Sequence, residues 1–344
     1  MRRVASMIVV MAFLSISLLG SSIKLIEPAD AIRLIGNKGI VFVSGESAES
    51  YQKAHIIGSI SMPACDLYGI AKAEDLSCAP LYRCPKEAEE YIRNKGIGNS
   101  QMVIAYDLFP GSDAVALYSF FETMGHKNLK ILNGGLASIR ALDPNQLVCD
   151  ELQAERKSIM KQAEAADQED DIDKEEDLES QAENIKAKMN LLESQLLIRD
   201  EVEAHKRSDY LLASEKFNMD FIADNIEARQ VFDDILKDGN ESISMMIDMR
   251  CADEGVAEDA AEENYTPGVT YVNWKDITDF EKNKRFKSAE EMQRVFDEAG
   301  VNRGKKLYVY CRNDASRSAY IAMALRLLGY THVKRLIDDK VVQK

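Results

Sequence analysis

The sequence predicts an α/β protein of two similar domains, each a parallel β-sheet flanked by helices, joined by an acidic helical linker. Short β-branched runs alternate with helix-like runs in residues 23–145, and the same alternation returns in residues 223–344. Strands that alternate with helices pair in parallel through helical crossovers. Residues 146–222 differ in composition, and the 344-residue chain is long enough for two separate cores.

In the first domain, apolar runs predict strands, and amphipathic runs that end in glycine predict helices. The expected strands are residues 39–45, 101–107 and 129–132, and the expected helices are residues 88–97 and 113–126. Glycine is a common helix end because it adopts the left-handed conformation without steric cost.

The second domain repeats this order. Ser288 and Glu291 have the spacing of a capping box at a helix start. The segments "MVIAYD…ALYSFFETMGHKNLKIL" and "LYVYC…AYIAMALRLLGYTHVKRL" share a strand–loop–helix–glycine–strand order, which indicates an internal duplication. The expected strands are 244–250, 306–311 and 332–337, and the expected helices are 288–300 and 318–330.

The linker contains no glycine or proline over residues 151–209 and carries an acidic run at 167–180. Its apolar residues alternate by four and three, the spacing of a coiled-coil seam. One interpretation is a helical linker that packs against a domain or folds back on itself. The other is a hairpin through which the protein associates with itself. The seam residues are Leu178, Ala182, Ile185, Met189, Leu192 and Leu196.

Residues 1–22 have the pattern of a secretory signal peptide. Arg2 and Arg3 precede an apolar run at 8–19, and small residues follow at 20–22. The run is shorter than the roughly 20 residues that a membrane span needs. We therefore expect cleavage and a periplasmic or secreted protein, with an uncleaved N-terminal anchor as the alternative.

Charge and cysteine content narrow the function classes. The net charge of −15 argues against nucleic acid as a partner, because phosphates require clustered Lys and Arg. The six cysteines lack zinc-ligand spacing, so we expect no structural metal. Cys65, Cys78 and Cys84 lie close together in the sequence, which favours one disulfide among them without indicating the pair.

Cys311 ends a predicted strand and precedes a predicted helix. Backbone N–H groups and the helix dipole stabilise anions at such a place and lower the pKa of a thiol. Arg312 and Arg317 add positive charge, and Asp314 opposes them. The alternative is a buried strand-end cysteine beside two arginines that face solvent.

Several segments, taken in order, resemble the tandem-domain rhodanese family of thiosulfate and 3-mercaptopyruvate sulfurtransferases. "IDMR" (247–250) and "YTPGVTYVNW" (265–274) resemble the family's Asp-x-Arg strand end and its "HIPGA" stretch. "FVSGESAESYQKAHIIGSISMP" (42–63) and "KILNGGLASI" (130–139) resemble the corresponding parts of a first domain. The resemblance implies two tandem rhodanese-like domains.

The resemblance also implies a role for each residue of the second loop. Cys311 takes a sulfane sulfur as a persulfide and passes it to an acceptor thiol or cyanide, without a metal or organic cofactor. Asp248 and Ser318 support the loop, and Asp107 at the matching position makes the first domain catalytically silent. The donor is a small anionic sulfur compound, and the acceptor is a thiol, which a protein can supply. The implied substrate-binding residues are Arg250, Arg312, Asn313, Asp314, Ala315, Ser316 and Arg317.

Two other functions stay open at this point. Five residues separate Cys311 from Arg317, and Ser318 follows, which resembles the Cys-x5-Arg-Ser loop of cysteine phosphatases and the related arsenate reductases. Asn313 and Asp314 stand where sulfurtransferases usually have glycine. A further alternative is a non-catalytic sulfur carrier or a partner-binding module.

Overall fold

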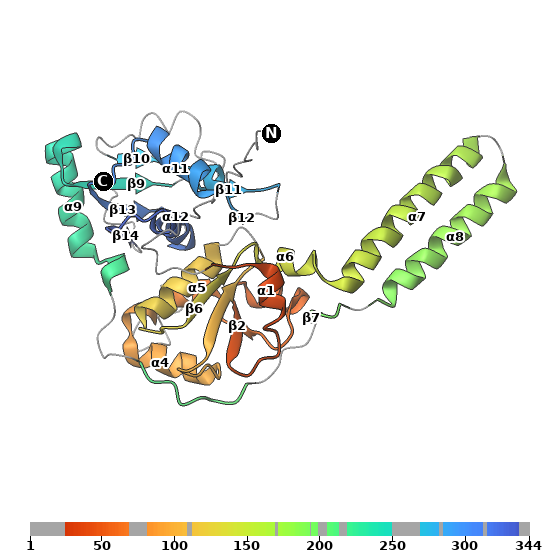
Figure 1. Ribbon diagram of the computed structural model, residues 1–344, viewed down its shortest axis with the longest axis horizontal. Coiled ribbons are helices and arrows are strands. Elements are labelled where there is room, and N and C mark those ends of the chain that lie inside the picture. Colours follow the sequence, from red (N-terminus) through yellow and green to blue (C-terminus); the bar gives the residue numbers. More distant parts are fainter. Residues whose placement is uncertain are drawn as a thin grey trace, which may run out of the picture.

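The computed structural model describes ten stretches of the chain. The two domains lie beside each other, and a helical hairpin extends away from them (Figure 1). The predicted signal peptide, residues 1–22, lies outside the described residues. No helix in the described part is both long and apolar enough to cross a membrane. The described residues are 25–68, 81–108, 112–168, 171–192, 194–198, 205–212, 219–249, 269–281, 285–311 and 315–336.

The first domain contains a five-stranded sheet in which every described pair of strands is parallel. The strand order is β1-β6-β5-β2-β4, so consecutive strands are joined by crossovers over the sheet faces. The strands are β1 (Leu25–Ile26), β2 (Ile40–Ser44), β4 (Ile60–Ser61), β5 (Met102–Tyr106) and β6 (Leu129–Leu132).

The second domain repeats this sheet with the order β8-β14-β13-β9-β10. Residues 204 positions apart are equivalent in the central strands: Val103 pairs with Leu129, and Leu307 pairs with Val333. The predicted duplication and the predicted α/β fold are therefore confirmed. The strands are β8 (Ile222–Ala223), β9 (Ser244–Asp248), β10 (Val269–Tyr271), β13 (Lys306–Tyr310) and β14 (Val333–Leu336).

Helices cover both sheets, and the four predicted helices are confirmed with small shifts of their ends. They are α4 (Pro85–Asn94), α5 (Ser112–Thr123), α11 (Ala289–Glu298) and α12 (Ala315–Leu327). The capping box of Ser288 and Glu291 forms at the start of α11. Shorter helices complete the first domain, and α9 completes the second. These are α1 (Pro28–Ile32), α2 (Ala48–Lys53), α3 (Ala64–Tyr68), α6 (Gly135–Arg140) and α9 (Asn225–Asp238).

One hydrophobic core continues from the first domain into the second through α5 and α12. Residues 114–121 of α5 are all buried, because the first sheet covers one side of the helix and the second domain covers another. A separate cluster fills the opposite face of each sheet. The two sheets therefore share the layer formed by α5 and α12, and neither domain closes its core alone.

An ion pair joins α5 to α12 at equivalent positions. Arg326 donates to both carboxylate oxygens of Glu122 at 2.8 Å, and the two residues are 204 positions apart. Their side chains are only 10% and 13% exposed. The Arg326 guanidinium also lies 3.7 Å from the centroid of the Phe221 ring. Because equivalent residues meet, an approximate two-fold axis passes between the helices.

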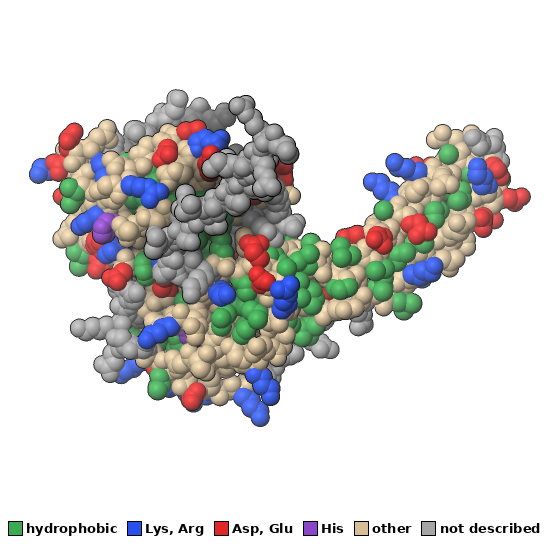
Figure 2. Space-filling model, in the orientation of Figure 1, with side chains coloured by type: hydrophobic (Ala, Val, Ile, Leu, Met, Phe, Trp, Pro, Cys, Tyr) green, Lys and Arg blue, Asp and Glu red, His purple; other side chains and the backbone are tan. Residues whose placement is uncertain are grey.

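Helices α7 (Pro144–Gln168) and α8 (Ile172–Asn190) form the hairpin. Ala163 and Ala166 of α7 are buried with Ala182 and Ile185 of α8, so the linker folds back on itself. Figure 2 shows charged side chains along the hairpin and hydrophobic side chains gathered where it meets the first domain. Self-association through this hairpin stays a prediction.

The prediction of a helical linker over 146–222 is wrong beyond the second helix. Helix α8 ends at Asn190, and the chain then returns along the first domain. Strand β7 (Leu197–Ile198) pairs antiparallel with β3 (His55–Ile56). Residues 222 and 223 already form β8 of the second sheet. The helical spacing could not show this, because the return path depends on contacts with distant residues.

The root of the hairpin is held by Asp143, a fully buried carboxylate. It accepts the N–H groups of Asn145 and Gln146 at the start of α7. It also accepts the Ser194 hydroxyl at 2.5 Å and the N–H of Leu196 at 3.0 Å on the returning chain. Burial acts to raise the pKa of Asp143, but these hydrogen bonds outweigh it and lower the pKa. One side chain thus ties both ends of the hairpin to the first domain.

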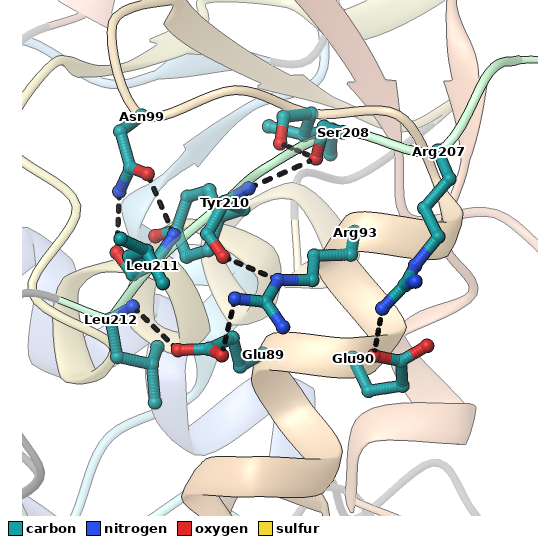
Figure 3. A network of polar contacts seen from close by, with 10 residues as sticks. Glu89, Glu90, Arg93, Asn99, Arg207, Ser208, Tyr210, Leu211 and Leu212 are labelled. Carbon is teal, nitrogen blue, oxygen red and sulfur yellow. Dashed lines mark hydrogen bonds and ion pairs between the residues drawn. The ribbon is translucent and has the colours of Figure 1, made fainter.

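The returning chain then runs over α4 and the loop after it (Figure 3). Arg93 donates to the carbonyl of Tyr210 at 2.6 Å, and the Asn99 side chain bonds both backbone polar groups of Leu211 at 2.6 and 2.7 Å. Tyr210 is fully buried against the first domain. These contacts hold the chain in place before it enters the second domain.

The Glu122–Arg326 pair is expected to hold the two domains together. Replacement of either partner by alanine leaves the other charge nearly buried, so each variant should lose about 3 kcal/mol of unfolding free energy. A double-mutant cycle measured by denaturant unfolding gives the coupling. The exposed pair Lys53–Glu49 is the matched control, and its coupling should be far smaller because solvent screens both charges. Additive effects of Glu122→Ala and Arg326→Ala would contradict this expectation.

Candidate functional site

Cys311 follows β13 directly, four residues before α12 begins. Its side chain is half-buried and packs against the shared hydrophobic core. The thiol therefore lies at the carboxyl end of a parallel strand and near a helix N-terminus, where ligands of open α/β sheets bind. Several predicted site residues lie outside the described residues: Arg250, Arg312, Asn313 and Asp314, together with the side chains of Ala315 and Ser316.

Asp248 ends β9, the strand next to β13, and is buried. Its Oδ2 accepts the hydroxyl of Tyr310 at 3.0 Å, and the N–H of Met249 donates to the Tyr310 carbonyl at 3.2 Å. Tyr310 immediately precedes Cys311, so these bonds fix the backbone from which the thiol extends. The sequence analysis did not single out Tyr310, since only the register of β9 with β13 brings its hydroxyl to Asp248.

Arg317 and Ser318 lie in the first turn of α12. The Arg317 guanidinium is 6.0 Å from the centroid of the Trp274 ring, at the outer limit of a cation–π contact. Ser318 is buried, and its hydroxyl lies 3.5 Å from the Leu336 carbonyl on β14. Both residues therefore lie near the N-terminus of α12, the helix that follows Cys311 in the sequence. Trp274 belongs to an aromatic cluster with Phe280, Phe286 and Tyr320.

Asp107 occupies the position in the first domain that Cys311 holds in the second. It follows β5, it is buried, and its Oδ2 accepts the N–H groups of Asp113 at 2.9 Å and Ala114 at 3.0 Å. These donors lie in the first turn of α5, where N–H groups have no partner within the helix. Their equivalents, 204 residues later, are Arg317 and Ser318. In the first domain the Asp107 side chain therefore accepts hydrogen bonds from the N-terminal turn of α5.

Acidic residues surround Asp107. Burial and the charges of Asp113 and Glu46 raise its pKa to about 8, although the two N–H groups that it accepts act in the opposite direction. Glu46 accepts the N–H of Leu108, and burial raises its pKa as well. The described residues contain no group of acidic, His or Cys side chains arranged to hold a metal ion. The negative charges of Glu46 and Asp113 therefore favour the protonated, uncharged form of Asp107.

The two loops differ in the sign of their charge. The first carries Glu46, Asp107 and Asp113, and the residues 204 positions later are Arg250, Cys311 and Arg317. The sequence analysis paired Asp107 with Cys311 but did not pair Glu46 with Arg250 or Asp113 with Arg317. The same offset of 204 residues relates all three pairs, so the sequence contained this information.

The cysteines fall into two states. Cys65, Cys149 and Cys311 carry thiols, whereas Cys84 is disulfide-bonded. Of the predicted set, Cys65 therefore takes no part in a disulfide, and the partner of Cys84 lies outside the described residues. Cys78 is also outside them.

Comparison with known proteins gives consistent matches. A family model described as a Rhodanese-like domain matches residues 27–142. Over 78 residues, 22% of this chain, the sulfur carrier protein TtuD of Thermus thermophilus is 36% identical. The match spans only 26% of that relative's length. A Saccharopolyspora erythraea protein named "Putative thiosulfate sulfurtransferase" is 25% identical over 313 residues, 87% of this chain and 85% of that protein.

Among solved structures, SseA, a 3-mercaptopyruvate sulfurtransferase of Escherichia coli, has the same fold. The TM-score is 0.60 at 18% sequence identity, and the alignment covers 91% of this chain and 97% of SseA. The match therefore extends over both domains.

Asp107 is expected to make stability depend on pH. Because its pKa is raised from 3.8 to about 8, the folded state binds the proton more tightly than the unfolded state. The free energy of unfolding should then fall as pH rises from about 4 to 8. Asp107→Asn keeps an acceptor oxygen but does not titrate, so from pH 5 to pH 8 it should gain at least about 1 kcal/mol relative to the wild type.

Denaturant unfolding at the two pH values measures this difference. Asp150→Asn, which removes an exposed carboxylate on α7, serves as the control and should follow the wild type. Parallel pH profiles for wild type and Asp107→Asn would refute a raised pKa at this site.

Proposed function

We propose that this chain is a tandem-domain sulfurtransferase of the rhodanese-like family and that Cys311 carries a sulfane sulfur between a donor and an acceptor. One observation carries the proposal. Of the two equivalent strand ends in the described structure, the first holds Asp107 and the second holds the thiol of Cys311. Cys311 lies four residues before a 13-residue helix, and this supports the proposal because a helix N-terminus lowers the pKa of a nearby thiol.

The proposed reaction is a double displacement. The Cys311 thiolate attacks the outer sulfur of thiosulfate, the sulfur–sulfur bond breaks, and sulfite leaves with the electron pair. An acceptor thiolate or cyanide then attacks the terminal sulfur of the persulfide, and the Cys311 thiolate leaves. Both steps balance without an outside oxidant or reductant, because each new bond to sulfur replaces a broken one. With 3-mercaptopyruvate or a polysulfide as the donor, the leaving group differs, but the Cys311 thiolate attacks the transferred sulfur in the same way.

The residues around Cys311 support an anionic donor. Arg317 brings a guanidinium to the first turn of α12, and Arg250 and Arg312 are further candidates from the sequence. Positive charge and helix N–H groups favour both the thiolate and the anion that it attacks. Asp248 acts through Tyr310 as a positioning residue. The first domain contributes α5, which packs on α12, and carries no sulfur because Asp107 replaces the thiol.

A second candidate function rests on loop length. The Cys-x5-Arg spacing of Cys311 and Arg317 is that of cysteine phosphatases and arsenate reductases, whose loops bind a tetrahedral oxyanion. A non-catalytic sulfur carrier is a third candidate. The three differ in what happens at Cys311: a sulfur that is gained and passed on, a phosphate that is released, or a sulfur that is gained and kept.

Intact mass spectrometry separates these functions. After incubation with thiosulfate, 3-mercaptopyruvate or polysulfide, the wild-type chain should gain about 32 Da, one sulfur atom, on Cys311. The gain should disappear in Cys311→Ser and persist in Cys149→Ser, the matched control on the hairpin. Addition of cyanide or a thiol should remove it.

Turnover of p-nitrophenyl phosphate is measured in parallel. Phosphate release without a mass gain would replace the sulfurtransferase with a phosphatase. A gain that no acceptor removes would favour the carrier.

A further inference from the structure

We propose that residues 205–212 form a pH-sensitive strap, which is held on the first domain while His126 is neutral and is released when His126 takes up a proton. The strap lies between the hairpin and the second domain in the sequence. Its release would lengthen the connection between the domains without unfolding either sheet. This device does not involve Cys311, so it is independent of the proposed function.

His126 follows α5 and is only 6% exposed. Its Nε2 lies 3.0 Å from the carbonyl of Gln101, which can only accept, so Nε2 carries the hydrogen. Its Nδ1 lies 3.3 Å from the hydroxyl of Tyr210. In a neutral imidazole this second nitrogen has no hydrogen, so the hydroxyl donates to it. One hydrogen bond of the neutral ring therefore holds the first domain to the strap.

Tyr210 is the strap residue that enters the first domain, and its side chain is fully buried. Its ring stacks on His126, with 5.8 Å between the ring centroids and an angle of 11° between the planes. In the described part of the chain, the bond to His126 is the only hydrogen bond of the Tyr210 hydroxyl. Protonation of His126 places a hydrogen on Nδ1, so the hydroxyl must turn its own hydrogen away. A buried donor then lacks an acceptor, and a buried cation lies beside it.

The surroundings of His126 favour its neutral form. Besides Tyr210, the groups that face it are the Gln101 carbonyl and the edge-on ring of Phe121. Burial lowers the pKa of His126 below its ordinary value of 6.5, and the bond to the Gln101 carbonyl acts in the opposite direction but is the weaker influence. No described carboxylate pairs with the imidazole, so its positive form has no counter-charge there.

Charged groups contact the strap at other places. Glu89 pairs with Arg93 on α4, accepts the N–H of Leu212, and acts with burial to raise the pKa of Tyr210. Glu90 binds Arg207 at the surface. On the adjoining elements His205 is half-buried, and three further charged residues are exposed: Lys127, Lys206 and Asp209. A test must therefore separate His126 from these groups.

The strap should detach as the pH falls. On release His126 meets water and its pKa returns toward 6.5, so the released state binds the proton more tightly than the docked state. The contribution of His126 to docking is then fully present well above pH 6.5 and is lost progressively below it. The bonds of Asn99 and Arg207 to the strap and α4 are exposed, and such contacts contribute little once Tyr210 leaves its site.

Hydrogen exchange of the full chain measures the release. The amides of Ser208, Leu211 and Leu212 are hydrogen-bonded to the first domain in the docked strap. Corrected for the intrinsic rate at each pH, their exchange should become at least about threefold faster from pH 7.5 to pH 5.5. One proton and a released pKa of 6.5 set an upper limit of about tenfold. The amides of β5 and β13 should stay protected at both pH values.

Two variants identify the titrating group. His126→Gln keeps a donor for the Gln101 carbonyl but does not titrate, so the increase should disappear. His205→Gln removes the imidazole of the strap itself and should keep the increase. An equal increase in wild type and His126→Gln, or no increase in the wild type, would overturn the proposal.

A steric release gives a second measurement that leaves His126 in place. Gly96 has a φ of +78°, and a Cβ there would lie 2.7 Å from the Lys206 carbonyl oxygen. Gly96→Ala should therefore release the strap already at pH 7.5 and remove the dependence on pH. Gly36→Ala is the matched control, because Gly36 has a φ of +80° and open space around its Cβ position. It should behave as the wild type, whereas an undiminished dependence on pH in Gly96→Ala would show that the dependence arises outside the docked strap and would refute the switch.

Discussion

The first N–H groups of a helix have no acceptor within the helix, and the two domains of this protein differ in the side chain that precedes these groups. Helices α5 and α12 each follow a central strand of a parallel sheet, so their N-termini open at the carboxyl edge of that sheet. In the first domain Asp107 accepts two of these N–H groups. In the second, Cys311 holds the matching position with a side chain one atom shorter. Under the proposed function, the atom that Cys311 adds to this shorter side chain is the transferred sulfur.

Duplication accounts for the two equivalent helix starts, and both helices belong to the shared hydrophobic core. Helices α5 and α12 lie against each other, and each covers one face of its own sheet. The equivalent residues Glu122 and Arg326 meet between the helices with opposite charges. Identical side chains at that place would repel, since two like charges would be buried together. The two copies have therefore diverged where they touch as well as at the strand ends that carry Asp107 and Cys311.

The hairpin of α7 and α8 is inserted without disturbing either sheet. Asp143 binds both the start of α7 and the returning chain, so the two ends of the insertion lie at one buried carboxylate. From there the chain crosses the first domain, held by Arg93 and Asn99, before it enters the second (Figure 3). The connection between the domains is thus a bound segment over residues 205–212, and the acidic helices stand apart from it (Figure 1).

The sequence by itself determined the long strands and helices, the duplication and the position of Cys311, because these depend on local periodicity and on a repeat with a constant offset. It did not determine the two- and three-residue strands β1, β4, β8 and β10, which are too short to show a period and exist through their parallel partners. Nor did it determine the return path of the linker. The acidic surroundings of Asp107 were also decided by tertiary structure. Glu46 lies 61 positions before Asp107 and comes near it only because β2 and β5 are neighbours in register. Such neighbours follow from sheet order, which no local pattern encodes.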